Sequence, residues 1–316
     1  MNGRTFLYLD EATVTALTGD VAAAREAVAA AFAAHRAEPA LTQPKLSLDV
    51  RPGHAFQSMC AASSALGLAV NKWYGFTEHG IDACLSLNDL ATGRLLAFMD
   101  GNAFTGVRTA AMSAAAAVHL APPDSRTIGF VGCGLQAESH LAALRSALPS
   151  LGAVRAFSRT RASAERLAQK ANAMGLDAVA TDDGAALLAA CDVVVTSVPM
   201  RPGFRPFLDA RLLKPGAFVA AVDVGRSWLS ESLTAFDRLA IDDRSQAGDY
   251  AGLIAGRPAP GYDADLAALC AGEGERPRPG ERSMFLFRGF ALADLAVAAL
   301  VYRRAIESGA GVPLGR

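Results

Sequence analysis

One stretch of the chain, from Thr127 to Thr160, constrains the fold more than any other. It contains an apolar run that ends in the sequence GCGLQA, then a helical pattern, and then a second apolar run that ends at Ser158. A strand, a glycine turn, a helix and a second strand in this order are typical of a dinucleotide-binding unit. Glycines also end strands for purely structural reasons, so the prediction depends on the whole succession and not on the glycines alone.

The residues of the turn have the sizes that a bound dinucleotide requires. Gly132 allows a tight turn, Gly134 lets the backbone approach a pyrophosphate, and Ala137 lets the helix pack closely on the strand. The N-terminus of the helix that follows would face the phosphates with free N–H groups and a partial positive charge. We therefore expect Gly132, Gly134, Leu135 and Gln136 to bind a cofactor.

The second strand of this unit ends in the sequence SRTR, which begins at Ser158. Folds that prefer NAD usually place an acidic residue here for the ribose 2′-hydroxyl group. A guanidinium and two hydroxyls suit a 2′-phosphate, which a carboxylate would repel. We therefore predict NADP(H) in preference to NAD(H), with Ser158, Arg159 and Thr160 at the phosphate. The alternative is a solvated basic turn.

Further apolar strands alternate with helices after this unit, as in Asp192 to Ser197 and Phe218 to Val222. Such alternation predicts a mostly parallel, doubly wound sheet, in which ligands bind outside the carboxyl ends of the strands. Asp223 is the best carboxylate candidate at such an end, where it would bind a substrate ammonium or exchange a proton with it. The alternative is a capping or loop carboxylate. Three other residues at a strand end are expected to line the nucleotide: Thr196, Ser197 and Val198. The alternative is a turn, which Thr and Ser at strand ends form more often.

The segment before the glycine turn has a different sequence pattern from the segment after it. Between Ala40 and Met99, short apolar runs are broken by Gly, Pro and Asn, which predicts an antiparallel or mixed sheet. A terminal helix from Ala291 to Glu307 would return to this part of the chain. The predicted fold is therefore α/β, with a Rossmann domain at residues 123–295 inserted in an α+β substrate-binding and dimerisation domain at residues 1–122 plus 296–316.

Three cations of the first domain, Lys45, Lys72 and Arg108, lie in or beside apolar runs. Such cations usually extend their charged ends to solvent or pair with an acid. Three of them in one domain would instead suit a substrate carboxylate. Cys133 lies inside the glycine turn, where a small side chain is required, so it is interpreted as a steric choice and not as a nucleophile.

Composition excludes several classes of partner. The 316 residues are 52% hydrophobic and 19% charged, which suffices for two domains with buried cores. Thirty basic and thirty-one acidic residues give no overall field that would favour nucleic acid or an anionic membrane. The five scattered cysteines form no C-x-x-C pair, and the sequence has no cationic leader with an apolar core. We expect a cytoplasmic protein with no metal, nucleic-acid or membrane partner.

Several motifs together closely resemble the ornithine cyclodeaminase/mu-crystallin family. The RTAA helix followed by G-x-G-x-Q-A is specific to that family, and the resemblance covers most of the chain. The residues that carry it include Asp100-Gly101, Thr105 to Ala111, Leu120-Ala121, Gly132 to Ala137, His140, Val222-Asp223 and Phe287-Arg288-Gly289 with Asp294.

The resemblance implies a dimeric enzyme that exchanges hydride between a nicotinamide cofactor and the carbon of a C–N bond. Members include ornithine and lysine cyclodeaminases, alanine dehydrogenase-like enzymes, imine reductases and the ligand-binding mu-crystallin. It implies that Lys72 and Arg108 hold the substrate carboxylate and that Asp223 acts on the reacting amine, so that Asp223 and Lys72 are the catalytic candidates. It also implies that Thr109 and the Gly132 turn hold the pyrophosphate.

Two positions depart from the cyclodeaminase pattern. Lys45 stands where that pattern has an arginine, and it lacks the bidentate fork of a guanidinium. Gln57 is the nearest match to a glutamate that would bind the distal ammonium of the substrate, and it carries no charge. Both residues are still expected to contact substrate, but recognition of a diamino acid is weakened.

The sequence therefore predicts an NADP(H)-dependent oxidoreductase that acts on the C–N bond of a small amino or cyclic imino acid. Imine or ketimine reduction ranks above conversion of ornithine to proline and ammonia, and above alanine dehydrogenase-like activity. A ligand-binding protein of the mu-crystallin kind, without turnover, is the alternative from another class. Joint retention of Lys72, Arg108 and Asp223 favours an enzyme, since a binder need not keep the acid.

Overall fold

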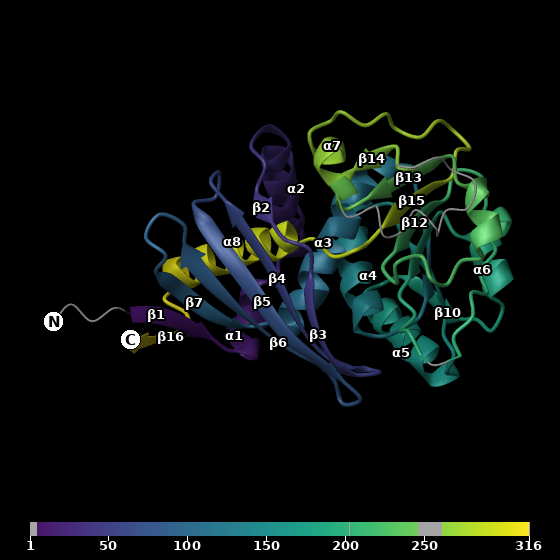
Figure 1. Cartoon of the computed structure of the whole chain (residues 1–316). Helices are drawn as coiled ribbons and strands as arrows, with labels where there is room; N and C mark the ends of the chain where they lie inside the picture. Colours follow the sequence, from purple (N-terminus) through teal and green to yellow (C-terminus); the bar gives the residue numbers. More distant parts are fainter. Residues whose placement is uncertain (1–4, 202, 246–260, 316) are drawn as a thin grey trace. The chain divides into compact units, whose positions relative to one another are not determined.

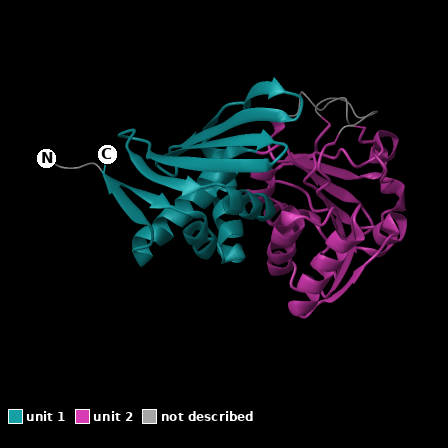
Figure 2. Ribbon diagram, turned by 90° about the horizontal axis from the view of Figure 1, so that it is seen from below, with its two compact units in different colours: residues 1–111, 290–316 teal, residues 112–289 magenta. Residues whose placement is uncertain are grey.

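The structure, a computed structural model, describes residues 5–201, 203–245 and 261–315. The chain forms two compact units, residues 1–111 with 290–316 (unit 1) and residues 112–289 (unit 2) (Figure 2). The chain passes from one unit to the other inside α3 (Asn102–Leu120) and directly before α8 (Ala291–Ser308).

These boundaries differ from those expected from the sequence, at 122/123 and 295/296. Two side-chain contacts near these boundaries lie within the units as the structure divides them. Ser113, in the second half of α3, bonds to His140 of unit 2. Asp294, in the first turn of α8, pairs with Lys72 of unit 1.

Unit 1 is built on a mixed sheet, in agreement with the prediction. The strand order is β16-β1-β7-β6-β5-β4-β2, with β3 also paired to β4. β1 and β7 are parallel, and the other pairs are antiparallel. The strands are β1 (Thr5–Leu9), β2 (Leu41–Thr42), β3 (Leu46–Arg51), β4 (His54–Ser63), β5 (Leu68–Thr77), β6 (Gly80–Asp89), β7 (Leu95–Asp100) and β16 (Val312–Gly315).

Helices cover one face of this sheet (Figure 1). α1 (Glu11–Leu17) and α2 (Val21–Ala37) begin at Asp10 and Asp20, whose carboxylates accept hydrogen bonds from the first-turn N–H groups. α8 packs on α2, β4 and β5. Because side chains alternate along a strand, Lys72 of β5 is buried on the α8 face, while its neighbour Trp73 is on the other face and 37% exposed.

Unit 2 is a parallel, doubly wound sheet, as predicted. The strand order is β10-β9-β8-β11-β12-β15-β13-β14, and each pair is parallel. The direction of strand succession reverses between β8 and β11, which is where such sheets bind ligands. The strands are β8 (Thr127–Val131), β9 (Ala153–Phe157), β10 (Asp177–Ala180), β11 (Val193–Thr196), β12 (Phe218–Ala221), β13 (Arg238–Ile241), β14 (Ala264–Asp265) and β15 (Ser283–Leu286).

The helices of unit 2 connect these strands. They are α4 (Leu135–Ala147), α5 (Arg161–Ala173), α6 (Gly184–Ala190) and α7 (Leu266–Cys270), with 3-10 turns η1 (Ala210–Leu212) and η2 (Ser230–Ala235). Among the residues described, no helix is both long and apolar enough to cross a membrane.

Candidate functional site

The glycine turn joins β8 to α4 at the point where the sheet reverses. Gly132 has a φ of +91°, and a Cβ atom there would lie 2.8 Å from the carbonyl oxygen of Ser197. Only glycine fits both conditions. Gly134 is the N-cap of α4 and supplies no side-chain cap, and a Cβ at Gly134 would meet nothing within 4 Å. The first N–H groups of α4 therefore have no side-chain cap, and there is room beside Gly134, which fits the approach of a pyrophosphate.

The end of β11 lies next to this turn. Ser197 donates its hydroxyl to the Gly132 carbonyl oxygen at 3.1 Å, and Thr196 donates to Asp223. Thr196, Ser197 and Val198 thus lie at the end of β11, beside the glycine turn and Asp223. Because both hydroxyl protons are already donated to protein groups, these residues hold the turn and Asp223 in position in addition to any contact with a nucleotide.

The end of β9 carries the residues predicted to bind a 2′-phosphate. Thr160 shares a hydrogen bond of 2.7 Å with Ser163. Arg161 bonds to Glu165 at 3.0 Å and to Asp182, so its charge is already paired. Arg159 is exposed and has no hydrogen-bond or ion-pair partner within the described parts of the chain. Of the two arginines, Arg159 is therefore the one available to an anion.

Asp223 follows β12 and is only 4% exposed. One carboxylate oxygen accepts from the Thr196 hydroxyl at 2.8 Å, and the other accepts from the Ser227 hydroxyl and from the Val198 amide. Burial raises the pKa of Asp223 above its usual value, while these hydrogen bonds hold it down. A carboxyl group with a raised pKa can both give and take a proton nearer neutral pH.

The backbone beside Asp223 is also unusual. Val224 has a φ of +63°, a left-handed conformation that a β-branched residue rarely adopts. Strain of this kind is often found at functional sites. It adds to the evidence that Asp223 is more than a loop carboxylate.

Unit 1 holds a cluster of buried charges on the α8 face of its sheet. Lys72 Nζ lies 2.8 Å from Asp294 Oδ1, and Arg108 Nε lies 3.2 Å from the same oxygen. Lys72 is 2% exposed and Asp294 is fully buried. Burial and the neighbouring Arg108 charge lower the pKa of Lys72 to about 8, against the opposing effect of Asp294.

Sequence reasoning did not assign Asp294 to the site. The signal was present, because an acid stands in the apolar helix sequence ALADLAVAALV. A buried carboxylate in such a helix requires a partner. The sequence does not say that this partner is Lys72, which lies on a strand more than two hundred positions earlier.

Gln57 and Tyr74 lie beside this cluster. Gln57 pairs with Tyr74 across β4 and β5, as Met59 pairs with Lys72, so all share one face of the sheet. The Tyr74 hydroxyl donates to Gln57 Oε1, and Gln57 Nε2 donates to the Ser47 hydroxyl at 3.1 Å. The side-chain oxygen of Gln57 is thus already bound to a protein donor. Tyr74 was not identified from the sequence.

Two further residues that the sequence predicted for the site differ in exposure. Lys45 is exposed, and its charge contributes to the lowered pKa of Lys72. Thr109 is buried and donates its hydroxyl to the Thr105 carbonyl oxygen at 2.8 Å, within α3. In this arrangement Thr109 presents only acceptor lone pairs to a ligand.

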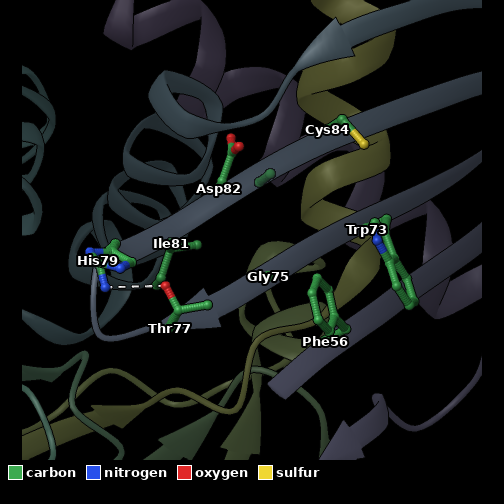
Figure 3. A pocket seen from close by; sticks show the side chains of 10 residues that line it. Phe56, Trp73, Gly75, Thr77, His79, Ile81, Asp82 and Cys84 are labelled. Atoms are coloured by element: carbon green, nitrogen blue, oxygen red, sulfur yellow. Dashed lines mark hydrogen bonds between the residues drawn. The ribbon is translucent and has the colours of Figure 1, made fainter. Parts of the chain in front are cut away.

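A separate hollow of about 360 Å³ lies on the other face of the unit 1 sheet (Figure 3). The rings of Phe56 and Trp73 stack there, with centroids 5.9 Å apart. Ile81, Asp82 and Cys84 also line it, and none of the residues predicted to bind substrate does. This hollow is therefore distinct from the charged cluster.

Two buried groups of unit 2 have no direct part in this chemistry. The Cys133 thiol bonds to the Phe157 carbonyl oxygen, and burial raises its pKa to about 12, so it stays a thiol. Burial lowers the pKa of His140 to about 4, so it is neutral at pH 7 and bonds to Ser113 and to the Gln136 carbonyl oxygen.

The described residues contain no group of three acidic, histidine or cysteine side chains that would hold a metal ion.

A doubly wound parallel sheet, an uncapped glycine turn at its point of reversal and a buried acid beside it define a class, the nucleotide-dependent α/β enzymes. Within that class, the chain belongs to the ornithine cyclodeaminase/mu-crystallin family, whose model matches residues 8–309. It is accordingly an NAD(P)-dependent oxidoreductase or cyclodeaminase that acts at a carbon–nitrogen bond.

Individual relatives agree with this assignment. The ketimine reductase mu-crystallin of Rattus norvegicus is 32% identical over 77% of this chain and 77% of its own length. The structure of an archaeal alanine dehydrogenase dimer with bound NAD superposes with a TM-score of 0.89 at 27% identity, covering 98% of this chain and 99% of that one. The iminosuccinate reductase of Paracoccus denitrificans in complex with NAD+ gives a TM-score of 0.86 at 25% identity, with the same coverage.

Proposed function

We propose that this protein is an NADP(H)-dependent reductase of a cyclic imino acid or ketimine acid. The observation that carries this proposal is the pairing of two site chemistries on one chain. Unit 1 offers Lys72 and Arg108 to a carboxylate, and unit 2 offers a buried acid with a raised pKa. Relatives named as reductases of imines, such as ketimine reductase and iminosuccinate reductase, support the same reaction type.

The lack of charge on Gln57 and its hydrogen bond from Tyr74 favour imine reduction over cyclodeamination. A cyclodeaminase must bind a second ammonium, for which an anionic oxygen is the natural partner. Gln57 is uncharged, and its oxygen already accepts from Tyr74. The cations nearby, Lys45, Lys72 and Arg108, would repel a second ammonium. The substrate we propose therefore has one carboxylate and no distal cation.

The roles of the residues follow from their chemistry. Bound NADPH would supply hydride to the carbon of the C=N bond. Lys72 and Arg108 bind the carboxylate and orient that carbon. The carboxyl group of Asp223 donates a proton to the nitrogen and is left as a carboxylate, which recovers a proton from water. The bond gains one hydride at carbon and one proton at nitrogen, so the product is the amino acid.

The proposed preference for NADPH rests on Arg159, whose guanidinium would bind the 2′-phosphate. Its guanidinium is exposed and unpaired within the described residues, and no acid follows β9 at this place to repel a 2′-phosphate. Arg159→Asp should shift the preference towards NADH by about tenfold or more, and the matched control Arg161→Asp should shift it less. An unchanged ratio of NADPH to NADH efficiency in Arg159→Asp would contradict the assignment.

We also propose that the protein is a homodimer that buries the apolar face of the unit 1 sheet. Phe56 and Trp73 lie on that face with their rings stacked, and Trp73 is 37% exposed. The related archaeal alanine dehydrogenase is a dimer. Light scattering would measure the mass in solution, and a monomer mass for the intact protein would contradict this proposal.

The experiment that tests the proposed reaction measures two products together. NADPH absorbance and ammonia release are followed with pyrroline-2-carboxylate and, separately, with ornithine. Steady consumption of NADPH with the cyclic imino acid supports the reductase. Ammonia and proline from ornithine without net change of cofactor would instead identify a cyclodeaminase. Turnover of neither, with tight binding of an apolar ligand, would identify a binding protein.

A further inference from the structure

A single buried carboxylate serves two cations in unit 1. Asp294 Oδ1 accepts from Lys72 Nζ at 2.8 Å and lies 3.2 Å from Arg108 Nε. Its second oxygen, Oδ2, is buried without a hydrogen-bond partner among the described residues. The carboxylate is therefore directed at the two cations through one oxygen.

More positive than negative charges surround Lys72. Arg108 from α3, Lys45 from the segment before β3 and Asp294 from α8 all act on it, and its ammonium lies 5.6 Å from the centre of the Tyr74 ring. Asp294 is the only anion in that set. Two cations that are buried side by side repel each other, and desolvation penalises both. Without Asp294, the change of lowest free energy is loss of a proton from Lys72, since an arginine does not deprotonate.

We propose that Asp294 is a positioning residue that keeps Lys72 in the ammonium form and aims it at the substrate carboxylate. This inference rests on the proposed function only in taking Lys72 and Arg108 as the carboxylate-binding pair. Lys72 donates one of its three hydrogens to Asp294 and keeps the others for an incoming anion. Asp294 itself has no contact with substrate in this account.

The pair has a consequence for pH dependence. The folded pKa of Lys72 is lowered from 10.5 to about 8, so carboxylate binding is strongest well below that pH and weakens as pH rises through it. Asp294 raises the Lys72 pKa within the folded protein. Removing its charge therefore moves the loss of binding to lower pH.

The first test compares Asp294→Asn with the intact enzyme from about pH 6 to about pH 10. The KM for the imino acid should begin to rise about one pH unit earlier or more in the variant, while kcat at saturating substrate changes much less. Asp20→Asn is the matched control, because it removes an exposed carboxylate of the same unit that pairs with Arg304. An Asp294→Asn profile that coincides with that of Asp20→Asn would overturn the proposal.

A second variant keeps the test valid if Asp294→Asn does not fold. Lys72→Arg retains a cation that does not titrate in this range, so the rise of KM at alkaline pH should disappear. In the Lys72→Arg background, Asp294→Asn should no longer move the profile. Persistence of the alkaline rise in Lys72→Arg would show that another group titrates, and Asp294 would lose its role.

Binding without turnover separates this inference from the proposed function. Calorimetry with pyrrole-2-carboxylate, a planar carboxylate that cannot be reduced in this way, measures affinity in the same pH range. If the protein reduces no imino acid but its affinity for this probe falls near pH 8 and falls earlier in Asp294→Asn, the proposed reaction fails and Asp294 keeps its role. If imines are reduced and both affinity profiles coincide, the Asp294 inference alone is wrong.

Discussion

The two units bury charge in opposite ways. In unit 1, cations gather around one acid, since Lys72 and Arg108 share Asp294. In unit 2, an acid is held by neutral donors, since Asp223 accepts from two hydroxyls and one amide. Burial shifts both groups towards neutral pH, lowering the pKa of Lys72 and raising that of Asp223.

The difference separates binding from proton transfer. A charge that must hold a ligand needs to stay charged, and a counter-ion close by serves that purpose. A group that must exchange a proton needs its two protonation states close in free energy, and neutral donors around a buried carboxyl group allow that. The same desolvation therefore produces two different functions, according to the partner that accompanies it.

The largest effect is expected at Asp223. Asp223→Asn keeps the shape of the side chain and one of its two acceptor oxygens but cannot give or take the proton, so kcat should fall by about a thousandfold. Cofactor affinity, measured by fluorescence titration with NADPH, should stay nearly unchanged. Asp177→Asn, at an exposed carboxylate of the same unit, is the control. Undiminished turnover in Asp223→Asn would remove Asp223 from the mechanism.

A smaller effect is expected at Lys72. Lys72→Met retains the length of the side chain and loses its charge, so the KM for the imino acid should rise by about a hundredfold. Cofactor affinity should not change. Lys170→Met removes an exposed cation of unit 2 and serves as the control. A loss of kcat with an unchanged KM would mean that Lys72 acts on the reacting atoms instead of the carboxylate.

Ser227 tests the neutral donors around Asp223. Its hydroxyl bonds to the carboxylate and lowers the Asp223 pKa. Ser227→Ala should therefore raise that pKa further, move the alkaline limb of the kcat profile to higher pH and reduce kcat by about tenfold. Ser232→Ala removes another buried hydroxyl of unit 2, which bonds to the Ala210 amide, and should leave the limb in place. A shift of equal size in both variants would contradict a specific effect on Asp223.

His140 is a buried titratable group without a charged partner, and its effect is on stability. Its folded pKa is lowered from 6.5 to about 4, so the unfolded state binds the proton first and stability is lost as pH falls below 6.5. Between about pH 7 and pH 5.5, the intact protein should lose about 1 kcal/mol more of its free energy of unfolding than His140→Gln does. Urea titrations at several pH values measure this. Parallel losses in both proteins would show that His140 is already protonated or exposed.

The sequence predicted the local elements and the nucleotide-binding type of unit 2, because glycine turns, caps and apolar periodicity are encoded over a few residues. The apolar runs at Asp192 to Ser197 and Phe218 to Val222 contain β11 and β12, and the expected terminal helix from Ala291 to Glu307 is α8. β15 was missed, although it lies between β12 and β13, because four residues after a proline-rich loop give too short a pattern.

The candidate site was predicted only in part, and the missing part is the set of partners. The sequence was enough to name Lys72, Arg108 and Asp223 as candidate site residues. The link from Lys72 to Asp294 joins β5 to α8, and the link from Tyr74 to Gln57 depends on the register of β4 and β5. Neither the packing of distant elements nor strand register can be read from local patterns. Those partners determine which charges remain available to a substrate.

Transfer of deuterium from the cofactor tests the central claim most directly. NADPH that carries deuterium at the reactive carbon is mixed with pyrroline-2-carboxylate and the intact enzyme, and the amino acid product is examined by mass spectrometry. The account predicts one deuterium at the α-carbon of the product, formed in step with oxidised cofactor and greatly reduced in Asp223→Asn. Product without the label, or oxidation of the cofactor without product, would contradict it.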